Sequence, residues 1–332
     1  MSQALTRIGG RRALLGSAAV LTALGLLLWW LLPIGDGTPR GTVTVSTGTP
    51  SGVYQKYGVL LRTALAKDLP ELDVRLLNSD GSQENVRRVA AGKADFTIAA
   101  ADAVEMYKLE NKPGADRLRA CARLYDDYVH LVVPRSSPVR SVADLKGRTV
   151  AVGPSGSGVR LIAEHVLEAA GLDPEKDITP LSDGIGTMPD RLRHHKIDAF
   201  FWSGGLPTSA VTELSRNFPV RLVPIGSDLV TKLHQQGGSS RYYRAALIPA
   251  DAYPDAERGS SVQTVAVANL LVTREDMDAD LTERITRVVI DSRDRIGAQV
   301  HAAQLVDLRT AIYSDPLELH RGARRYYRSV KP

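Results

Sequence analysis

The chain has 332 residues, of which 43% are hydrophobic and 24% charged, and its formal net charge is +5. This composition is that of a globular protein and excludes a wholly disordered or fibrous chain. The basic residues are scattered rather than gathered with aromatic residues on one motif, which argues against nucleic-acid binding. The single cysteine, Cys121, excludes an internal disulfide bond and a cysteine-based zinc site, and we expect it to be a small buried side chain.

The first feature in chain order is the uncharged stretch of residues 13–32, which follows three arginines. A helix of this length rises about 30 Å, the thickness of the hydrocarbon core of a bilayer. Cations before such a span place its N-terminal side in the cytoplasm. We therefore predict a cytoplasmic segment at 1–12, a single-pass transmembrane anchor at 13–32 in the cell membrane, a linker at 33–41 and an extracytoplasmic remainder. A long signal peptide that is cleaved is the alternative.

Beyond the linker, predicted strands and helices alternate, which is the pattern of parallel α/β layers. In the first third we predict helices at 53–67 and after Ser82, and strands at 42–46, 72–77 and 95–99. In the middle we predict helices at 159–170 and 188–195, and strands at 128–133, 149–152, 197–202 and 263–273. Residues after about 280 are predicted to be mainly helical, and we expect the arginines of 321–328 to form a solvated helix face.

A loop of glycine, serine and threonine residues recurs between a predicted strand and the helix that follows it. It occurs at 46–52, 153–158 and 203–207, with a weaker case at 79–82. A helix N-terminus offers unpaired N–H groups and the positive end of the helix dipole, and glycine lets the backbone come close. Such loops bind carboxylates and other anions at the edge of an open α/β sheet. For any one loop, ordinary turn and capping chemistry is the alternative.

No segment carries a recognised enzyme motif. Residues 153–158 lack the Lys-Ser/Thr pair of a phosphate-binding loop, and no stretch reads G-x-S-x-G. The histidine spacings do not match a metal site, so we expect no metal and no cofactor. Asp126 and Asp127 could form a carboxylate pair, although a hydrated surface turn is the favoured interpretation.

The segment from about Thr42 to the end resembles the TAXI family of solute receptors, which serve TRAP transporters. The resemblance rests on an ordered set of segments rather than on any one of them. These are 46–54 (STGTPSGVY), 78–85 (NSDGSQEN), 94–95 (AD), 144–147 (DLKG), 150–158 (VAVGPSGSG), 198–207 (DAFFWSGGLP) and 319–327 (LHRGARRYY). The chain departs from the family at Gln55, where a second aromatic residue is common, and at Arg321, where proline is usual.

The resemblance implies an α/β periplasmic-binding-protein fold of the second type, in which two lobes joined by two long strands close over a ligand. The crossing strands would be 128–133 and 263–273. Lobe one would then comprise 42–130 and 274–332, and lobe two 131–273. The resemblance also implies a small anionic solute, such as an acidic amino acid or a dicarboxylate. The positions that match the family's binding loops are Thr47, Gly48, Thr49, Tyr54, Ser79, Ser82, Ser155, Ser157, Phe201, Gly204 and Pro207.

Several residues also have a purely structural interpretation. Tyr54 is either a lid over the ligand or part of the core. Phe200 is predicted to be core, and Phe201, on the opposite face of the strand, to line the cleft. Arg160 could pair with a ligand carboxylate, although a solvated arginine is favoured because the helix dipole repels a cation there. Asp102 could bind a ligand ammonium group or cap the following helix.

The leading hypothesis is an extracytoplasmic solute-binding receptor, anchored by residues 13–32, that passes a small anionic solute to a TRAP-type permease. Two alternatives stay open. The same clamshell could be a sensor whose ligand-bound form docks on a membrane signalling protein. It could instead be an envelope enzyme with Ser155 or Ser157 as nucleophile, which requires a histidine within hydrogen-bond reach. The favoured hypothesis predicts no enzymatic activity.

Overall fold

The computed structural model describes residues 39–330, and the part from Arg40 onward forms one compact unit. The predicted alternation of strands and helices is confirmed in this part of the chain. The predicted anchor at 13–32 lies outside the described residues. Within 39–330, none of the helices is both long enough and apolar enough to cross a bilayer.

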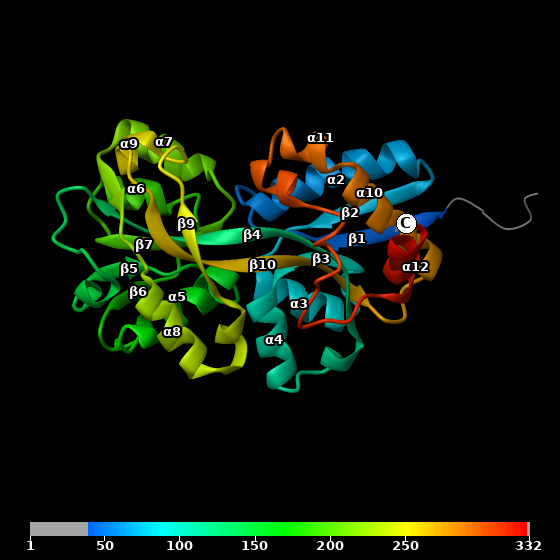
Figure 1. Ribbon diagram of the computed structural model, residues 1–332, viewed down its shortest axis with the longest axis horizontal. Coiled ribbons are helices and arrows are strands. Elements are labelled where there is room, and N and C mark those ends of the chain that lie inside the picture. The colour runs from blue at the N-terminus through cyan, green and yellow to red at the C-terminus, as the bar shows by residue number, and fades with distance from the viewer. Residues whose placement is uncertain (1–38, 331–332) are drawn as a thin grey trace, which may run out of the picture. The chain divides into compact units, whose positions relative to one another are not determined.

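A ten-stranded sheet runs through the whole unit (Figure 1). Its strands are β1 (Gly41–Ser46), β2 (Leu72–Leu77), β3 (Phe96–Ala100), β4 (Leu118–Pro134), β5 (Thr149–Ala151), β6 (Thr179–Leu181), β7 (Ala199–Gly204), β8 (Val220–Leu222), β9 (Arg244–Ile248) and β10 (Val262–Arg274). The main path is β2–β1–β3–β10–β4–β7–β5–β6, with β8 paired to β4 and β9 paired to β10.

The long strands β4 and β10 join two halves of this sheet. On one side β1 pairs in parallel with β2 and β3, and on the other β5 pairs in parallel with β6 and β7. Between them, β10 runs antiparallel to β3 and β4, and β4 runs antiparallel to β7. We call β1–β3 with their helices the first half, and β5–β7 with theirs the second half. The predicted lobe boundaries at 130/131 and 273/274 fall within β4 and β10 and stay a prediction.

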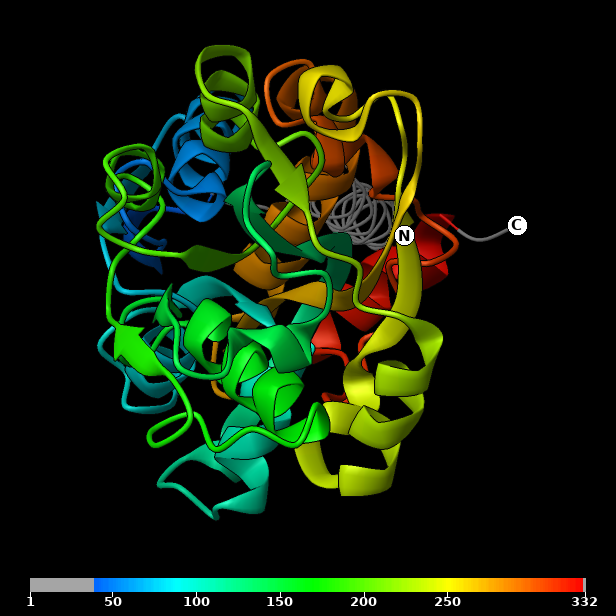
Figure 2. The same cartoon turned by 90° about the vertical axis from the view of Figure 1, so that its left-hand side faces the viewer.

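Helices cover both faces of the sheet in each half, as parallel strands require (Figures 1 and 2). They are α2 (Val53–Asp68), α3 (Ser82–Ala90), α4 (Ala101–Leu109), α5 (Gly158–Ala169), α6 (Met188–Arg193), α7 (Ser209–Asn217), α8 (Ser227–Gln236), α9 (Pro254–Glu257), α10 (Ala279–Asp291), α11 (Arg293–Gly297) and α12 (Arg321–Val330). Short 3₁₀-helices are η1 (Ala115–Arg117), η2 (Val142–Leu145), η3 (Gly238–Tyr242) and η4 (His301–Leu305).

Two hydrophobic clusters form the core. One lies beneath α3 and α4 and continues through the second half, where Val132 and Phe200 are fully buried. The other lies beneath α2, α10 and α12 and includes Tyr57 and Cys121. Cys121 is 0% exposed, which confirms the prediction for it. Each fully buried aliphatic side chain stabilises the fold by about 1.5–3 kcal/mol, so these clusters dominate the energetics.

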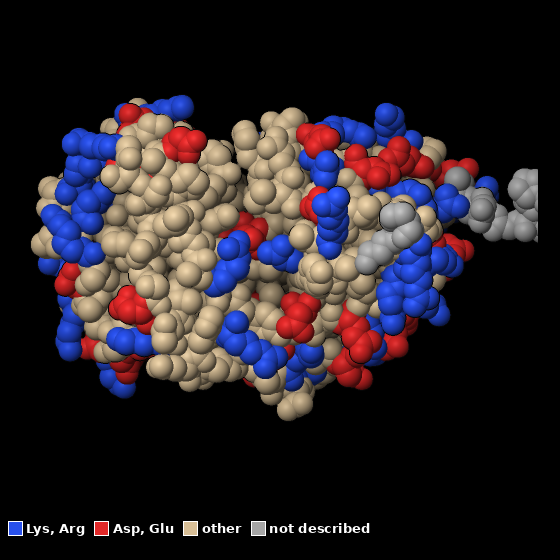
Figure 3. All heavy atoms as spheres, in the orientation of Figure 1, with Lys and Arg blue, Asp and Glu red and all other residues tan. Residues whose placement is uncertain are grey.

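The last helix, α12, separates its arginines from its tyrosines. Arg321 and Arg328 are exposed, and arginines gather on the surface over this helix (Figure 3). Tyr326 and Tyr327 point inward, and the Tyr327 hydroxyl donates to the carbonyl oxygen of Cys121 (3.0 Å). The predicted solvated helix face is confirmed.

The strand β4 begins earlier than the sequence predicts. The prediction covers 128–133, whereas the strand extends over Leu118–Pro134. Four charged residues interrupt the apolar pattern and hide the continuation of the strand: Arg119, Arg123, Asp126 and Asp127. The structure tolerates two of them because the Arg123 guanidinium pairs with the Asp126 carboxylate (2.6 Å).

Truncation of a core residue on β4 tests this arrangement. Leu131 is 1% exposed, and Leu131→Ala is expected to lower the free energy of unfolding by about 2–5 kcal/mol because it leaves a cavity. Leu247→Ala on β9 is the control, since Leu247 is 57% exposed, and should change that free energy by less than about 0.5 kcal/mol. Urea unfolding measures both, and equal effects would contradict the burial of β4.

Candidate functional site

A cavity of about 60 Å³ lies between the two halves of the sheet. A buried water needs about 10–15 Å³ by the same measure, so the space has room for roughly four to six waters. Its walls come from loops of both halves and from the central strands β4 and β10. The lining residues are Gly48, Thr49, Gly52, Val53, Tyr54, Asp80, Gly81, Ser82, Ala100, Asp102, Asp127, Pro154, Ser157, Gly158, Val159, Gly184, Ile185, Trp202, Ser203 and Val267.

Five of the residues predicted to bind ligand line this cavity: Gly48, Thr49, Tyr54, Ser82 and Ser157. They lie in the loops after β1, β2 and β5 or at the start of the helix that follows the loop, and these segments are far apart in the sequence. The first two loops meet because β1 and β2 are neighbouring parallel strands whose carboxyl ends lie at one edge of the sheet. The loop after β5 comes from the other half of the sheet, which β4 and β10 join to the first. That they contact a solute stays a prediction.

Thr47 and Ser79 do not line the cavity but hold its first two loops in place. The Asn85 side chain, which is 0% exposed, is the centre of this arrangement. Its amide nitrogen donates to the carbonyl oxygens of Thr47 (2.6 Å) and Ile98 (2.9 Å). Its oxygen accepts from the hydroxyls of Ser46 and Ser79 (2.7 Å each). These buried polar groups therefore satisfy one another. Asn85 ends the segment 78–85 on which the resemblance partly rests, but the sequence analysis assigned it no role.

Tyr54 links the first two loops to the central strand β10. Its hydroxyl hydrogen-bonds with the Ser82 hydroxyl (3.0 Å) and donates to Oδ1 of Asn269. Burial, and then the nearby Asp127 charge, raise the pKa of the Tyr54 hydroxyl well above its ordinary value. The hydroxyl therefore stays protonated. The core interpretation of Tyr54 is confirmed, because the side chain packs against the hydrophobic cluster beneath α2. The side chain also lines the cavity, and its role as a lid over a ligand stays a prediction.

The loop after β5 presents Ser157 to the cavity and Ser155 to solvent. Ser157 caps α5, since its hydroxyl accepts from the backbone N–H of Arg160 (3.0 Å) and donates to the carbonyl oxygen of Pro154 (2.7 Å). The Arg160 guanidinium is neither solvated nor directed at the cavity, because it pairs with Glu175 (2.6 Å). The ordinary capping interpretation is therefore confirmed for this loop.

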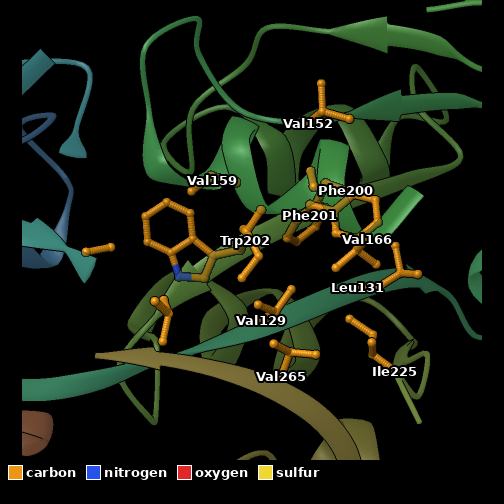
Figure 4. Close-up of a cluster of buried hydrophobic side chains, with 14 of the residues drawn as sticks. Val129, Leu131, Val152, Val159, Val166, Phe200, Phe201, Trp202, Ile225 and Val265 are labelled. Carbon is orange, nitrogen blue, oxygen red and sulfur yellow. The ribbon is translucent and has the colours of Figure 1, made fainter. Parts of the chain in front are cut away.

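The loop after β7 departs most from the prediction. Phe201 is 0% exposed and lies beside Phe200 inside the hydrophobic cluster (Figure 4), which corrects the expectation that it lines the cleft. The next residue, Trp202, lines the cavity instead, and its indole N–H donates to the Thr208 hydroxyl (3.0 Å). A Cβ at Gly204 would lie 2.6 Å from the indole nitrogen, so glycine there leaves room for the ring rather than for a solute.

A larger open groove of about 1210 Å³ adjoins the cavity. It runs between α2, α7 and η4, and Figure 3 shows the surface hollowed between the two halves. Pro207, predicted to bind ligand, is exposed and lies along this groove rather than in the cavity. The residues that line both spaces, and so separate them, are Gly52, Val53, Ile185 and Trp202.

The two adjacent aspartates of β4 lie inside the structure, which corrects the favoured surface-turn interpretation. Asp126 and Asp127 are 7% and 5% exposed. As neighbours in a strand they point to opposite faces of the sheet. Asp126 pairs with Arg123 (2.6 Å) and with Arg244. Asp127 instead lines the cavity opposite Val267, and its Oδ1 has no hydrogen-bond partner.

The cavity raises the pKa of both of its buried carboxyl groups. Burial raises the pKa of Asp127 to about 7, with a lowering contribution from Asn269 and raising contributions from the charges of Asp126 and Asp102. Burial also raises the pKa of Asp102 to about 6, against the lowering effect of the hydrogen bond from Tyr243. Carboxyl groups in this range are partly ionised at neutral pH and respond to any charge placed beside them.

Asp102 connects the two halves through a chain of hydrogen bonds. The Tyr243 hydroxyl, from the second half, donates to Oδ2 of Asp102 (2.8 Å). Nδ1 of His165 on α5 lies 2.8 Å from the same hydroxyl. A second link between the halves is the ion pair of Arg241 with Glu105 (2.7 Å).

The halves also touch beside the cavity. The Gln83 side chain donates to the carbonyl oxygen of Ser157 (2.8 Å). The backbone N–H of Glu84 donates to the carbonyl oxygen of Gly156 (3.1 Å). A Cβ at Gly81 would lie 3.4 Å from Cα of Ser157, so the two backbones are in close contact. The structure therefore shows the halves closed on each other.

The serine-nucleophile alternative requires a histidine beside Ser155 or Ser157. A serine needs an activating base within hydrogen-bond reach to become a nucleophile. The Ser157 hydroxyl is engaged with Pro154 and with α5, and Ser155 is exposed outside the cavity. Among residues 39–330, no histidine lines the cavity.

The fold is that of periplasmic solute-binding proteins. The chain is similar to the alkanesulfonate-binding protein SsuA from Xanthomonas axonopodis pv. citri bound to MOPS, at 16% identity over 89% of this chain and 86% of that chain, with a TM-score of 0.50. It is also similar to a protein of Bordetella bronchiseptica RB50, at 18% identity over 88% of this chain and 90% of that one, with a TM-score of 0.51. At these identities the likeness shows the fold alone.

The family follows from the sequence match. Residues 45–330 match the NMT1-like family, and the chain therefore belongs to it. The match begins within β1 and ends within α12, so it includes both halves and every residue that lines the cavity.

Contact between the halves at Gly205 can be tested by adding one carbon atom. A Cβ at Gly205 would lie 2.5 Å from Cβ of Ala302 on η4, closer than two carbon atoms can approach. Gly205→Ala is expected to hold the halves apart and to increase the radius of gyration in small-angle X-ray scattering. Adding Ala302→Gly removes the clash and should restore the original scattering curve. An unchanged curve for the single variant would show that closure does not depend on this contact.

The raised pKa of Asp127, about 7, makes the free energy of unfolding depend on pH. The unfolded aspartate titrates near pH 4, so unfolding releases a proton between about pH 4 and 7, and stability falls as pH rises through this window. Asp127→Asn removes the titrating carboxyl group and with it this contribution to the pH dependence. The substitution should stabilise the unliganded protein by roughly 1–4 kcal/mol at pH 8, and by less at pH 5. Chemical denaturation at the two pH values measures the difference. Identical pH profiles for the variant and the original would contradict it.

Proposed function

We propose that the protein is an extracytoplasmic receptor that captures a small solute in the cavity between its halves and delivers it to a membrane permease. The observation that carries this proposal is the origin of the cavity walls. They come from loops of both halves and from both strands that join them, so a bound solute would contact all of these parts at once. A solute of that kind favours the closed form over an open one.

The closure that we propose is a hinge motion of two lobes, 42–130 with 274–332 against 131–273. The support for these boundaries is that β4 pairs with β7 of the second half, while β10 pairs with β3 of the first. Bending within the two strands would change the separation of the lobes without breaking either lobe's own sheet.

The solute that we propose is a small acid, in the class of acidic amino acids and dicarboxylates. Two helices begin at the cavity, α3 at Ser82 and α5 at Gly158. Their N-termini direct N–H groups and the positive ends of two helix dipoles toward the space, which favours a carboxylate. The hydroxyls of Thr49 and Tyr54 add polar groups beside them.

The partner that we propose is a TRAP-type permease. Its support is the resemblance to TAXI receptors, which runs in order from residues 46–54 to 319–327. Anchoring by residues 13–32 would keep the receptor beside that permease. A sensor that docks on a membrane signalling protein would use the same cavity, and purification of the full chain with its bound membrane partner distinguishes the two.

A thermal-shift screen of the full chain tests the receptor function. Amino acids, dicarboxylates and keto acids form the panel, and we expect one class to raise the melting temperature in a saturable way. A ligand at 100 times its dissociation constant adds about 2.7 kcal/mol of stability, which corresponds to a shift of several degrees. No shift with any compound would contradict the proposal.

A pair of matched variants assigns the shift to the cavity. Thr49 lines the cavity and is half-buried, so Thr49→Trp is expected to fill the space and abolish the shift. Ser155 lies on the exposed part of a neighbouring loop, and Ser155→Trp should leave the shift unchanged. Loss of the shift in both variants, or in neither, would place the solute elsewhere.

A further inference from the structure

The cavity is lined by three aspartates, Asp80, Asp102 and Asp127, and by no lysine or arginine. Carboxylates that share a small space raise one another's pKa and repel a further negative charge. The N-termini of α3 and α5 would bind one carboxylate of a solute, but they do not explain why aspartates line the same cavity. A solute that carries only negative charge does not suit this lining.

The three aspartates differ in what they already bind. Asp80 is exposed to solvent. Both oxygens of Asp102 are occupied, since they accept from the Tyr243 hydroxyl and from the backbone N–H of Ala103 (2.8 Å each). Asp127 is 5% exposed, and its Oδ1 has no partner. Among the lining carboxylates, Asp127 is therefore the one that is buried with an unused acceptor.

The two arginines that pair with the preceding residue of β4 form no ion pair with Asp127. Arg123 and Arg244 both pair with Asp126, the preceding residue of β4. Because side chains alternate along a strand, that pairing lies on the opposite face of the sheet from Asp127. The neighbouring carboxylate is thus neutralised within the protein, whereas the one that faces the cavity is not.

We propose that Asp127 binds a protonated amine of the solute. The solute is therefore an amino acid or another amine-bearing acid rather than a dicarboxylate without an amine. This inference rests on the proposed receptor function and narrows its solute class. An ammonium group supplies the opposite charge that Asp127 lacks and a donor for its unused Oδ1. The amine lies against β4, while the carboxylate of the same solute lies at the N-termini of α3 and α5.

Calorimetry with paired compounds tests the inference on the full chain. L-glutamate is compared with glutarate, and L-alanine with propionate, because the members of each pair differ only by the amine. We expect at least one amine-bearing compound to bind, and its deaminated partner to bind at least tenfold more weakly. Asp127→Asn should lower the affinity for the amine-bearing compound at least tenfold. It should also remove most of the difference in affinity between the two compounds of the pair. Asp68→Asn is the control, because Asp68 is an exposed acid at the end of α2 that does not reach the cavity, and it should change neither affinity more than about twofold.

The outcomes separate the inference from the receptor function. Equal affinities within a pair, or tighter binding of glutarate than of glutamate, would overturn the amine site while leaving a small-acid receptor intact. An unchanged preference in Asp127→Asn would also overturn the role of Asp127. Binding of no compound from any tested class would overturn both. Thermal unfolding of each variant without ligand shows whether it is folded.

The pH dependence of binding supplies a second readout. Asp127 must be ionised to pair with an ammonium group, so the affinity of the wild-type protein for the amine-bearing compound should rise several-fold from pH 6 to pH 8. The titratable groups that face Asp127 are Asp102 of α4, Tyr54 of α2 and Tyr125 of β4, and the charge of Asp126 acts on it from the opposite face of the sheet. Burial raises the pKa of both tyrosines well above their ordinary value, so they stay neutral over this range. Asp102, whose pKa is raised to about 6, also ionises in the lower part of this range, so a smaller rise should remain in Asp127→Asn. A flat wild-type profile would contradict the inference.

Discussion

The pairing of β4 with β10 is the interaction on which the rest of the structure depends. These strands of 17 and 13 residues are the longest of the described sheet, and they lie at its centre. β10 pairs with β3 of the first half and β4 with β7 of the second, so the loops at the ends of β1, β2, β5 and β7 are gathered around the same pair of strands. Residues of the pair, Asp127 and Val267, form part of the cavity wall. The site therefore exists only when the long-range pairing is complete.

The same pairing explains how charge is distributed around the cavity. Strand alternation sends Asp126 to the face where Arg123 and Arg244 lie, and sends Asp127 to the cavity. The protein thus keeps a buried carboxylate unpaired where a solute would lie. A buried group of this kind discriminates strongly, because a solute that cannot pair with it leaves the cost of its burial uncompensated.

Much of the fold could be predicted from the sequence, because hydrophobic periodicity and Gly/Ser loops are local signals. The strands around 42–46 and 263–273 were predicted within a residue or two of their observed bounds. The site was predicted less well. Thr47 and Ser79 lie in two of the loops that we predicted to offer donors to a ligand. In the structure, the buried Asn85 side chain instead binds the Ser79 hydroxyl and the Thr47 carbonyl oxygen. That outcome depends on a contact between distant segments, which no local pattern reveals.

The predictions for Phe201 and for the two adjacent aspartates were also wrong, because they too depend on contacts between distant segments. Phe201 and Trp202 alternate along β7, but both faces of that strand are covered, so alternation alone cannot tell which side chain reaches the cavity. Asp127 had a signal in the sequence, a charged pair within an apolar run, but a surface turn explains such a pair equally well. Only the position of Arg244, which is distant in sequence, shows that one aspartate is paired and the other is not.

The most direct measurement is a crystal structure of the protein grown with an equimolar mixture of amino acids and their deaminated analogues. The prediction is one solute in the cavity between the halves, with its carboxylate at the starts of α3 and α5 and a nitrogen within about 3.2 Å of Asp127. A solute in the open groove beside α7, or a dicarboxylate bound in the cavity without a nitrogen near Asp127, would contradict it.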